Sequence, residues 1–209
     1  SDVDELGKYA TIPVINALTD DDHPTQLLAD WLTIRENFGK DLKKRKFVYI
    51  GDGNNVANAW LIMGATMGAH IVVATPAGKW APKSSVVDQA NKIAKKSGGK
   101  IEVITDPKAA AQDASVIYTD VWMSMGDSEA DRAEKTSALS SFAVTNDLMR
   151  LTTKDSIFMH CLPAHRGEEV AADVIDGPKS VVWRQAFHRR TTIQALLYHL
   201  TRGDLKGNK

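Results

Sequence analysis

Residues 46–56 read Lys46-Phe-Val-Tyr-Ile-Gly-Asp-Gly-Asn-Asn-Val56, an apolar run followed by a glycine turn. Such a run is typical of a buried parallel strand that leads through a tight turn into a helix. The turn resembles a dinucleotide-binding fingerprint, but Val56 stands where the third glycine is required. The next strand ends at Thr75 without an acid for a ribose hydroxyl, so an NAD-dependent oxidoreductase is disfavoured.

The same alternation of strand and helix extends along the chain. Strand candidates are Thr11–Asn16, Lys46–Ile50, His70–Thr75, Lys100–Thr105, Ser115–Asp120, Ser156–His160 and Ser180–Trp183. Helical windows are Pro24–Phe38, Asn55–Met67, Lys83–Lys96, Pro107–Asp113, Asp127–Leu139, Glu168–Ile175 and Phe187–Thr201. This order predicts an α/β fold with a doubly wound, Rossmann-like parallel sheet flanked by helices. We expect an N-terminal strand-helix segment at 1–38, the α/β domain at 39–185, and a C-terminal helix and tail at 186–209.

Composition narrows the class of protein. The 209 residues hold 26 Lys and Arg against 26 Asp and Glu, which gives no electrostatic case for nucleic acid or an anionic membrane. No apolar run approaches the roughly 20 residues that span a bilayer. The single cysteine, Cys161, predicts neither an internal disulfide nor a zinc cluster. The acidic, polar start carries no secretory or transit signal, so we expect a cytoplasmic protein.

Polar residues follow two of the predicted strands. Asp120 stands where a strand gives way to a loop that contains Ser124; it either holds a ligand ammonium or caps a turn. His160 and Cys161 end another strand. Neighbours on a strand point to opposite faces, so we do not expect a simple nucleophilic dyad, and a buried inert thiol is the alternative.

A third polar group opens the helix at Pro24. Pro24 suits the first helical position, which makes His23 the N-cap. Histidine is not a preferred cap, so the free N–H groups, His23 and Gln26 are available to a carbonyl or phosphate oxygen, unless this is an ordinary polar helix start.

Four motifs in order carry a family resemblance: HPTQ at 23–26, GDGNN at 51–55, TDVWMSMG at 119–126 and HCLPAHRGEEV at 160–170. Together they resemble the ornithine carbamoyltransferases, with similarity from about Glu5 to Gly203. The resemblance implies carbamoyl transfer from carbamoyl phosphate to the side-chain amine of L-ornithine, giving L-citrulline and phosphate. It implies no cofactor and no metal. The segment 39–185 would then bind ornithine, and the helices at Pro24 and Phe187 would bridge to a second domain.

The resemblance also implies roles for particular residues. The substrate-binding set would be Asn55, Asp120, Ser124, Met125 and Leu162, and the catalytic set His23, Gln26, Asp120, Cys161 and Arg189. Negative charge develops on the carbonyl oxygen when the amine attacks, and fixed donors such as His23, Arg189 and a backbone group near Leu162 would stabilise it. Asp120 and Cys161 would position the neutral amine without forming a covalent intermediate.

Two features depart from the family. No Ser-Thr-Arg-Thr-Arg phosphate motif occurs in the 209 residues, so we expect the carbamoyl-phosphate domain to be absent. At 184–190 Arg184, Gln185 and Phe187 replace the acids of the family's Asp-Glu-Ala-Glu-Asn-Arg run, although Arg189 keeps its place.

These departures lead to further expectations. An absent phosphate site predicts weak or no turnover by this chain alone. The alternative is a non-catalytic amino-acid-binding or protein-interaction module derived from the family. Helices Pro24–Phe38 and Phe187–Thr201, left uncovered, would expose apolar faces and favour self-association.

Overall fold

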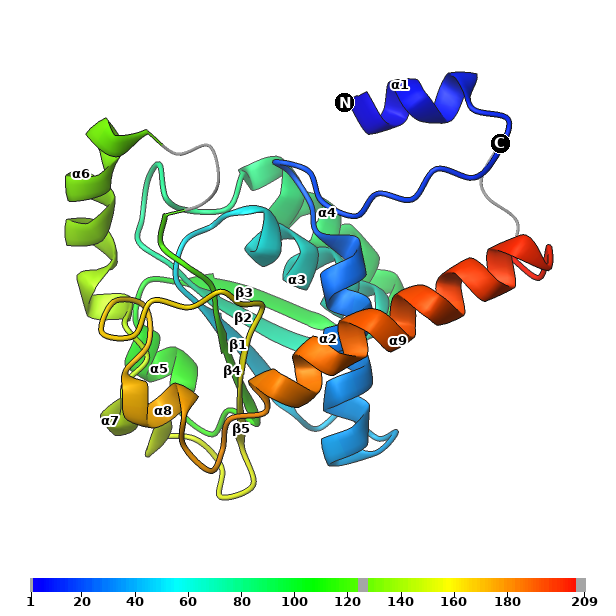
Figure 1. The fold of residues 1–209 in the computed structure, drawn as a ribbon. Coiled ribbons are helices and arrows are strands. Elements are labelled where there is room, and N and C mark those ends of the chain that lie inside the picture. The colour runs from blue at the N-terminus through cyan, green and yellow to red at the C-terminus, as the bar shows by residue number, and fades with distance from the viewer. Residues whose placement is uncertain (1, 124–127, 206–209) are drawn as a thin grey trace.

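The computed structural model describes residues 2–123 and 128–205. Within those ranges five parallel strands form one sheet in the order β3-β2-β1-β4-β5 (Figure 1). The strands are β1 Lys46–Ile50, β2 His70–Ala74, β3 Lys100–Ile104, β4 Val116–Thr119 and β5 Ile157–His160. The chain adds β2 and β3 on one side of β1 and then β4 and β5 on the other. The predicted doubly wound α/β fold is therefore confirmed.

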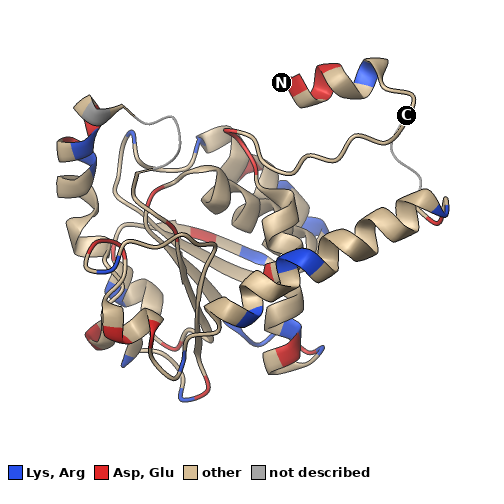
Figure 2. Cartoon of the chain, in the orientation of Figure 1, with Lys and Arg blue, Asp and Glu red and all other residues tan. Residues whose placement is uncertain are grey.

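Helices separate the strands in sequence. They are α1 Asp2–Tyr9, α2 Pro24–Phe38, α3 Asn55–Thr66, α4 Ser84–Ser97, α5 Pro107–Ala111, α6 Glu129–Leu139, α7 Asn146–Met149, α8 Ala172–Ile175 and α9 Val182–Thr201, with a 3-10 turn, η1, at Ser140–Phe142. No helix in the described part of the chain is long and apolar enough to cross a membrane. Figure 2 shows Lys and Arg interspersed with Asp and Glu along these elements.

Both faces of the sheet are covered, which explains the nearly continuous apolar strands. Phe47 and Tyr49 of β1 point into a core formed with α2, α3 and α4. Val48 and Ile50 point into the opposite core, formed with α5, α7 and α8. All four side chains are fully buried. The central strand thus fixes the position of the turn that follows it.

The turn after β1 requires glycine at residue 53. A Cβ there would lie 2.3 Å from the backbone nitrogen of Pro82. Gly53 N–H also donates to the Trp80 carbonyl at 2.8 Å, which holds the 76–83 loop against the turn. The glycine therefore permits close approach of two backbones, which a larger residue would prevent.

The N-terminal segment differs from the prediction. Residues 11–16 form no strand; they are extended, with Ile12 74% and Val14 38% exposed. Pro13, which cannot donate a ladder hydrogen bond, interrupts the run, and the run pairs with none of the five strands of the described sheet. Helix α1 precedes the segment and stands away from the sheet (Figure 1), with none of its residues buried.

Two C-terminal predictions also need correction. Ser180–Trp183 is not a strand: Ser180 forms an isolated bridge with Phe158, and α9 begins at Val182, before the expected Phe187. The expected boundary after residue 185 thus lies inside α9. The window Glu168–Ile175 shortens to α8, because Gly167, at φ 90°, turns the chain before it.

The long helices α2 and α9 pack against each other rather than standing uncovered. Leu27 and Ile34 of α2 are fully buried, and Thr33 shares a 2.9 Å hydrogen bond with His188 Nδ1 of α9. One face of α2 is therefore covered, while Leu28 and Leu32 of the same helix each remain 37% exposed. On α9, Leu197 and Tyr198 remain 48% and 55% exposed.

Candidate functional site

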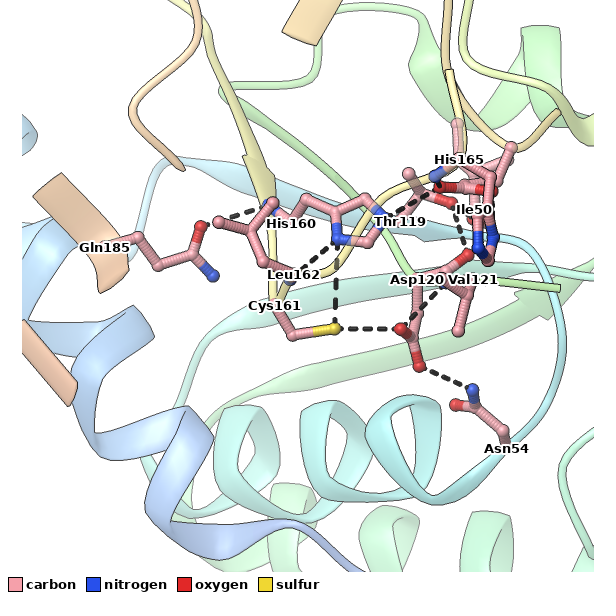
Figure 3. Close-up of polar contacts among 11 residues, drawn as sticks. Ile50, Asn54, Thr119, Asp120, Val121, His160, Cys161, Leu162, His165 and Gln185 are labelled. Atoms are coloured by element: carbon pink, nitrogen blue, oxygen red, sulfur yellow. Dashed lines mark hydrogen bonds and ion pairs between the residues drawn. The ribbon is translucent and has the colours of Figure 1, made fainter. Parts of the chain in front are cut away.

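Polar side chains gather where β1, β4 and β5 end, beside the first turn of α2. In open parallel sheets this edge, at the point where strand order reverses, is where ligands bind. Figure 3 shows Asp120 between Asn54 and Cys161, with His160 and Gln185 on the side of β5. The topology therefore brings together three of the four motif segments, and α2 supplies the fourth.

Asp120 is the centre of this group and is only 7% exposed. Its Oδ2 accepts a 2.7 Å hydrogen bond from Asn54 Nδ2. Its Oδ1 accepts from the Cys161 thiol and from the Val121 backbone N–H, each at 2.8 Å. Three donors around one carboxyl group fix its orientation.

Asn54 is a site residue that the sequence analysis did not select. Its Oδ1 caps α3 by accepting from Val56 N at 3.0 Å and Ala57 N at 3.1 Å, which leaves Nδ2 for Asp120. The selected neighbour, Asn55, instead donates from Nδ2 to the Thr19 carbonyl at 2.8 Å. Asn55 thus ties the segment before α2 to α3 and does not contact Asp120 in this structure.

Cys161 is held as a neutral thiol. Burial, reinforced by the charge of Asp120, raises its pKa well above the ordinary value. His160 Nδ1 lies 4.0 Å from the thiol sulfur, but it already accepts from Leu162 N at 2.9 Å, and Nε2 lies 3.2 Å from Glu169 Oε1. The shorter contact of the thiol is the hydrogen bond that it donates to Asp120.

Leu162 is placed by that histidine. Its φ of 60° is unusual for a residue with a side chain, and its peptide bond to Pro163 is cis. The N–H bond to His160 and the buried His160–Glu169 pair hold the turn that carries it. Glu169 also accepts from the His165 N–H at 2.6 Å.

His23 forms the N-cap of α2, as predicted, and its side chain makes no capping bond. Its Nδ1 lies 2.7 Å from the Ala17 carbonyl, which can only accept, so Nδ1 carries the proton. Burial lowers the pKa of His23, and the Asp120 carboxylate partly offsets this by raising it. The neutral ring therefore presents Nε2 as an acceptor, and Nε2 donates only after protonation.

Arg189 reaches the same helix start from α9. Its Nη1 donates to Thr25 Oγ1 at 3.2 Å, and Thr25 Oγ1 in turn donates to the Ala17 carbonyl at 2.9 Å. The guanidinium and His23 interact electrostatically. Although the surrounding residues differ from the family pattern, Arg189 lies beside the HPTQ motif.

Gln26, the last HPTQ residue, is buried and donates from Nε2 to Asp30 Oδ1 at 2.8 Å. Ser124 and Met125, both expected to bind substrate, lie outside the described residues.

Metal-ligating atom types occur in the centre, but the protein already uses them. Asp120, His160 and Cys161 each offer one ligand atom within 4.8 Å of the others. The thiol hydrogen goes to Asp120, and both His160 nitrogens have protein partners. Each of these three side chains therefore already has hydrogen-bond partners within the protein.

Comparison with known proteins identifies the family. A family model described as the Asp/Orn binding domain of aspartate/ornithine carbamoyltransferase matches residues 43–200. The chain belongs to the aspartate/ornithine carbamoyltransferase family. The model of that family's carbamoyl-P binding domain matches residues 1–36. The expectation that this domain is absent is therefore wrong, since residues 1–36 match part of it.

Individual relatives of the chain support the family assignment. It is 51% identical over 205 residues to "Ornithine carbamoyltransferase, anabolic" of Pyrococcus furiosus, covering 98% of the chain and 64% of that protein. It is 46% identical over 203 residues to "Ornithine carbamoyltransferase" of Methanoculleus marisnigri, covering 97% and 63%. The chain thus spans less than two thirds of the length of these relatives.

Solved structures agree. The ornithine carbamoyltransferase structure from Pyrococcus furiosus matches with a TM-score of 0.90 at 51% identity, covering 98% of this chain and 64% of that one. The structure from Gloeobacter violaceus matches with a TM-score of 0.87 at 41% identity, covering 95% and 66%. The carbamoyltransferase fold is therefore retained over almost the whole chain.

The double use of Asn54 predicts a measurable stability effect. Asn54→Ala should lower the free energy of unfolding by about 2 kcal/mol, because it removes a helix cap and one donor to buried Asp120. Urea denaturation measures this loss. Asp106→Ala is the matched control, since Asp106 caps α5 through Lys108 N and Ala109 N on an exposed surface. Equal losses in the two variants would mean that the bond to Asp120 adds nothing.

Proposed function

We propose that the chain supplies the ornithine site and part of the carbamoyl site of an ornithine carbamoyltransferase. The observation that carries the proposal is the carboxyl group of Asp120, fixed by Asn54, Cys161 and the Val121 backbone beside the start of α2. A fixed carboxylate attracts the ammonium form of a side-chain amine and orients the amine once it has lost its proton. The names of the relatives favour a catalytic role over a non-catalytic module.

The reaction forms a C–N bond and breaks the bond between the carbamoyl carbon and the phosphate oxygen. The neutral side-chain amine of ornithine attacks the carbamoyl carbon, the carbonyl oxygen becomes negative, and phosphate leaves as the amine loses a proton. Arg189 would stabilise the developing oxyanion, together with backbone groups near Leu162. His23 would add a donor only when its ring is protonated, because Nδ1–H is already given to Ala17.

The remaining roles follow from hydrogen-bonding capacity. Gln26 would meet the carbamoyl nitrogen, Cys161 and Asp120 would position the amine, and Ser124 and Met125 would contact the amino-acid end of ornithine. Asn55 would stabilise the segment that carries His23, rather than contact substrate directly. The expected weak turnover loses its main support, because residues 1–36 match the carbamoyl-phosphate domain. The three-segment division and self-association remain predictions.

Ornithine use is tested by citrulline formation with L-ornithine and carbamoyl phosphate. We expect citrulline with L-ornithine, and no carbamoylated product with L-aspartate as the matched substrate. Calorimetric titration with L-ornithine in the presence of carbamoyl phosphate gives a readout independent of turnover. Carbamoylation of aspartate, or neither citrulline formation nor ornithine binding by the folded protein, would overturn the proposal.

A further inference from the structure

The Asp30 carboxyl group is completely buried one helical turn after Gln26 on α2. Its Oδ1 accepts from Gln26 Nε2 at 2.8 Å and from Gln185 Nε2 at 2.7 Å. The other oxygen, Oδ2, is buried and has no hydrogen-bond partner among the described residues. Burying a carboxyl group while one of its oxygens has no hydrogen-bond partner costs folding free energy. That cost points to a role for Asp30 beyond packing.

The backbone N–H of His160 determines which atoms donate and which accept in the hydrogen bonds that link Gln185, Asp30 and Gln26. His160 N donates to Gln185 Oε1 at 3.0 Å, so the carbonyl end of the Gln185 amide must face β5. Its NH2 end therefore faces Asp30, and Asp30 Oδ1 must accept. Because Oδ1 is an acceptor, Gln26 must also direct its NH2 toward Asp30.

This chain of contacts leaves one polar atom of Gln26 for a ligand, the carbonyl oxygen Oε1. A carbamoyl NH2 group can only donate, so it requires an acceptor at this position. Without a fixed partner, the Gln26 amide could turn either its oxygen or its NH2 group toward the ligand. An NH2 group there would face the carbamoyl NH2 group, and two donors cannot form a hydrogen bond. Asp30 removes that second orientation.

We propose that Asp30 is a positioning residue that, with Gln185, holds Gln26 with its carbonyl oxygen toward the carbamoyl nitrogen. The inference rests on the proposed function for its substrate, while the hydrogen-bonded group itself stands on the structure alone. Both the ionised and the protonated carboxyl group offer Oδ1 as an acceptor, so the positioning holds in either state. In the protonated state Oδ2 carries the hydrogen.

The surroundings of Asp30 give the group a measurable signature. Burial raises its pKa to about 7, against the hydrogen bonds from Gln26, Gln185 and Tyr118, which lower it. The other charged or titratable groups that act on it are Arg189 of α9 and Cys161 after β5. Gln26 and Gln185 share one carboxyl oxygen, so their amide signals should follow the same titration.

The first test is NMR of the side-chain amides in the full chain labelled with nitrogen-15. The Gln26 and Gln185 NH2 signals should shift together with a midpoint near pH 7, and the step should vanish in Asp30→Asn. Asn37 is the internal control, because its Nδ2 donates to the Thr33 carbonyl on the same helix at 2.8 Å and should show no step. Different midpoints for the two glutamines, or Gln26 and Gln185 NH2 signals that are unchanged in Asp30→Asn, would overturn the proposal.

The second test separates positioning from stability by kinetics. Asp30→Asn retains an acceptor oxygen, so its KM for carbamoyl phosphate should stay within about threefold of wild type. Asp30→Leu removes it and should raise that KM about tenfold or more, with a much smaller change in the KM for ornithine. Thr33→Val is the control for loss of a buried polar group on α2. An unchanged KM in Asp30→Leu would overturn the positioning role.

The two tests distinguish the two proposals. A wild-type protein that makes no citrulline contradicts the proposed function, while the NMR titration still decides whether Asp30 holds both glutamines. If Asp30→Leu does not fold, the NMR of wild type and Asp30→Asn gives the decision.

Discussion

Asp120→Asn is expected to reduce the kcat for citrulline formation about 10²–10³-fold, the range seen when one preorganised electrostatic group is lost from an active site. The carboxylate accepts from Asn54, Cys161 and Val121 on its two oxygens. An asparagine has one oxygen, so its NH2 group would face a donor on one side or the other. The substitution therefore removes the charge and disrupts the geometry together.

Cys161→Ala is the informative comparison for this prediction. A thiol with a raised pKa is a poor nucleophile, and the nearest imidazole nitrogen, His160 Nδ1 at 4.0 Å, already accepts from Leu162 N. Removal of the thiol therefore costs mainly its hydrogen bond to Asp120. We expect a loss of about tenfold or less in kcat. Abolition of turnover in Cys161→Ala, with little effect in Asp120→Asn, would contradict the assigned roles and favour covalent catalysis. Steady-state kinetics with both substrates measures the two variants.

Much of the fold could be predicted, because periodicity is a local property. The apolar runs at Lys46–Ile50 and Lys100–Ile104 are strands, and α2 has the predicted bounds Pro24–Phe38. Asp120 and Cys161, which the sequence places at or after the ends of two predicted strands, lie in hydrogen-bond contact at the carboxyl edge of the sheet, where ligands bind in such folds.

Other features depend on information that local sequence lacks. The run Thr11–Asn16 has β-branched residues, but a strand requires a neighbouring edge, and none is paired with it in the described sheet. The pair Asn54-Asn55 offers two equivalent amides, and only the exact start of α3 decides which one is the cap and reaches Asp120. Asn54 therefore contacts Asp120, while Asn55, one residue later, bonds to the Thr19 carbonyl.

The segment 184–190 at the start of α9, which departs from the family pattern, makes specific contacts with α2 and β5 in the folded protein. Arg184 Nε donates to Glu36 Oε2 of α2 at 2.8 Å, and Arg184 Nη2 donates to Glu36 Oε1. Gln185 contacts Asp30 and His160. The contact between Asp30 and Gln185 joins residues 155 positions apart, so no local pattern could predict it.

Breaking the buried ion pair between Lys135 and Asp52 should produce the largest loss of stability. Lys135 Nζ of α6 lies 2.6 Å from Asp52 Oδ2 in the glycine turn after β1, and the two side chains are 3% and 9% exposed. Replacing Lys135 removes the ammonium group that lies against the buried Asp52 carboxylate. Lys135→Met should therefore lower the free energy of unfolding by about 3–5 kcal/mol, as urea denaturation would show.

The double variant Lys135→Met with Asp52→Leu tests the cause of that loss. It removes both charges and retains most of the apolar volume, so we expect it to recover most of the stability lost in Lys135→Met. Arg166→Met is the matched exposed control, because Arg166 and Asp176 are 48% and 51% exposed, and its loss should be at most about 1 kcal/mol. Equal losses in Lys135→Met and Arg166→Met would contradict the prediction. Because the Lys135–Asp52 pair joins α6 to the turn that holds Asn54, the same variants also report whether anchoring α6 maintains the Asp120 site.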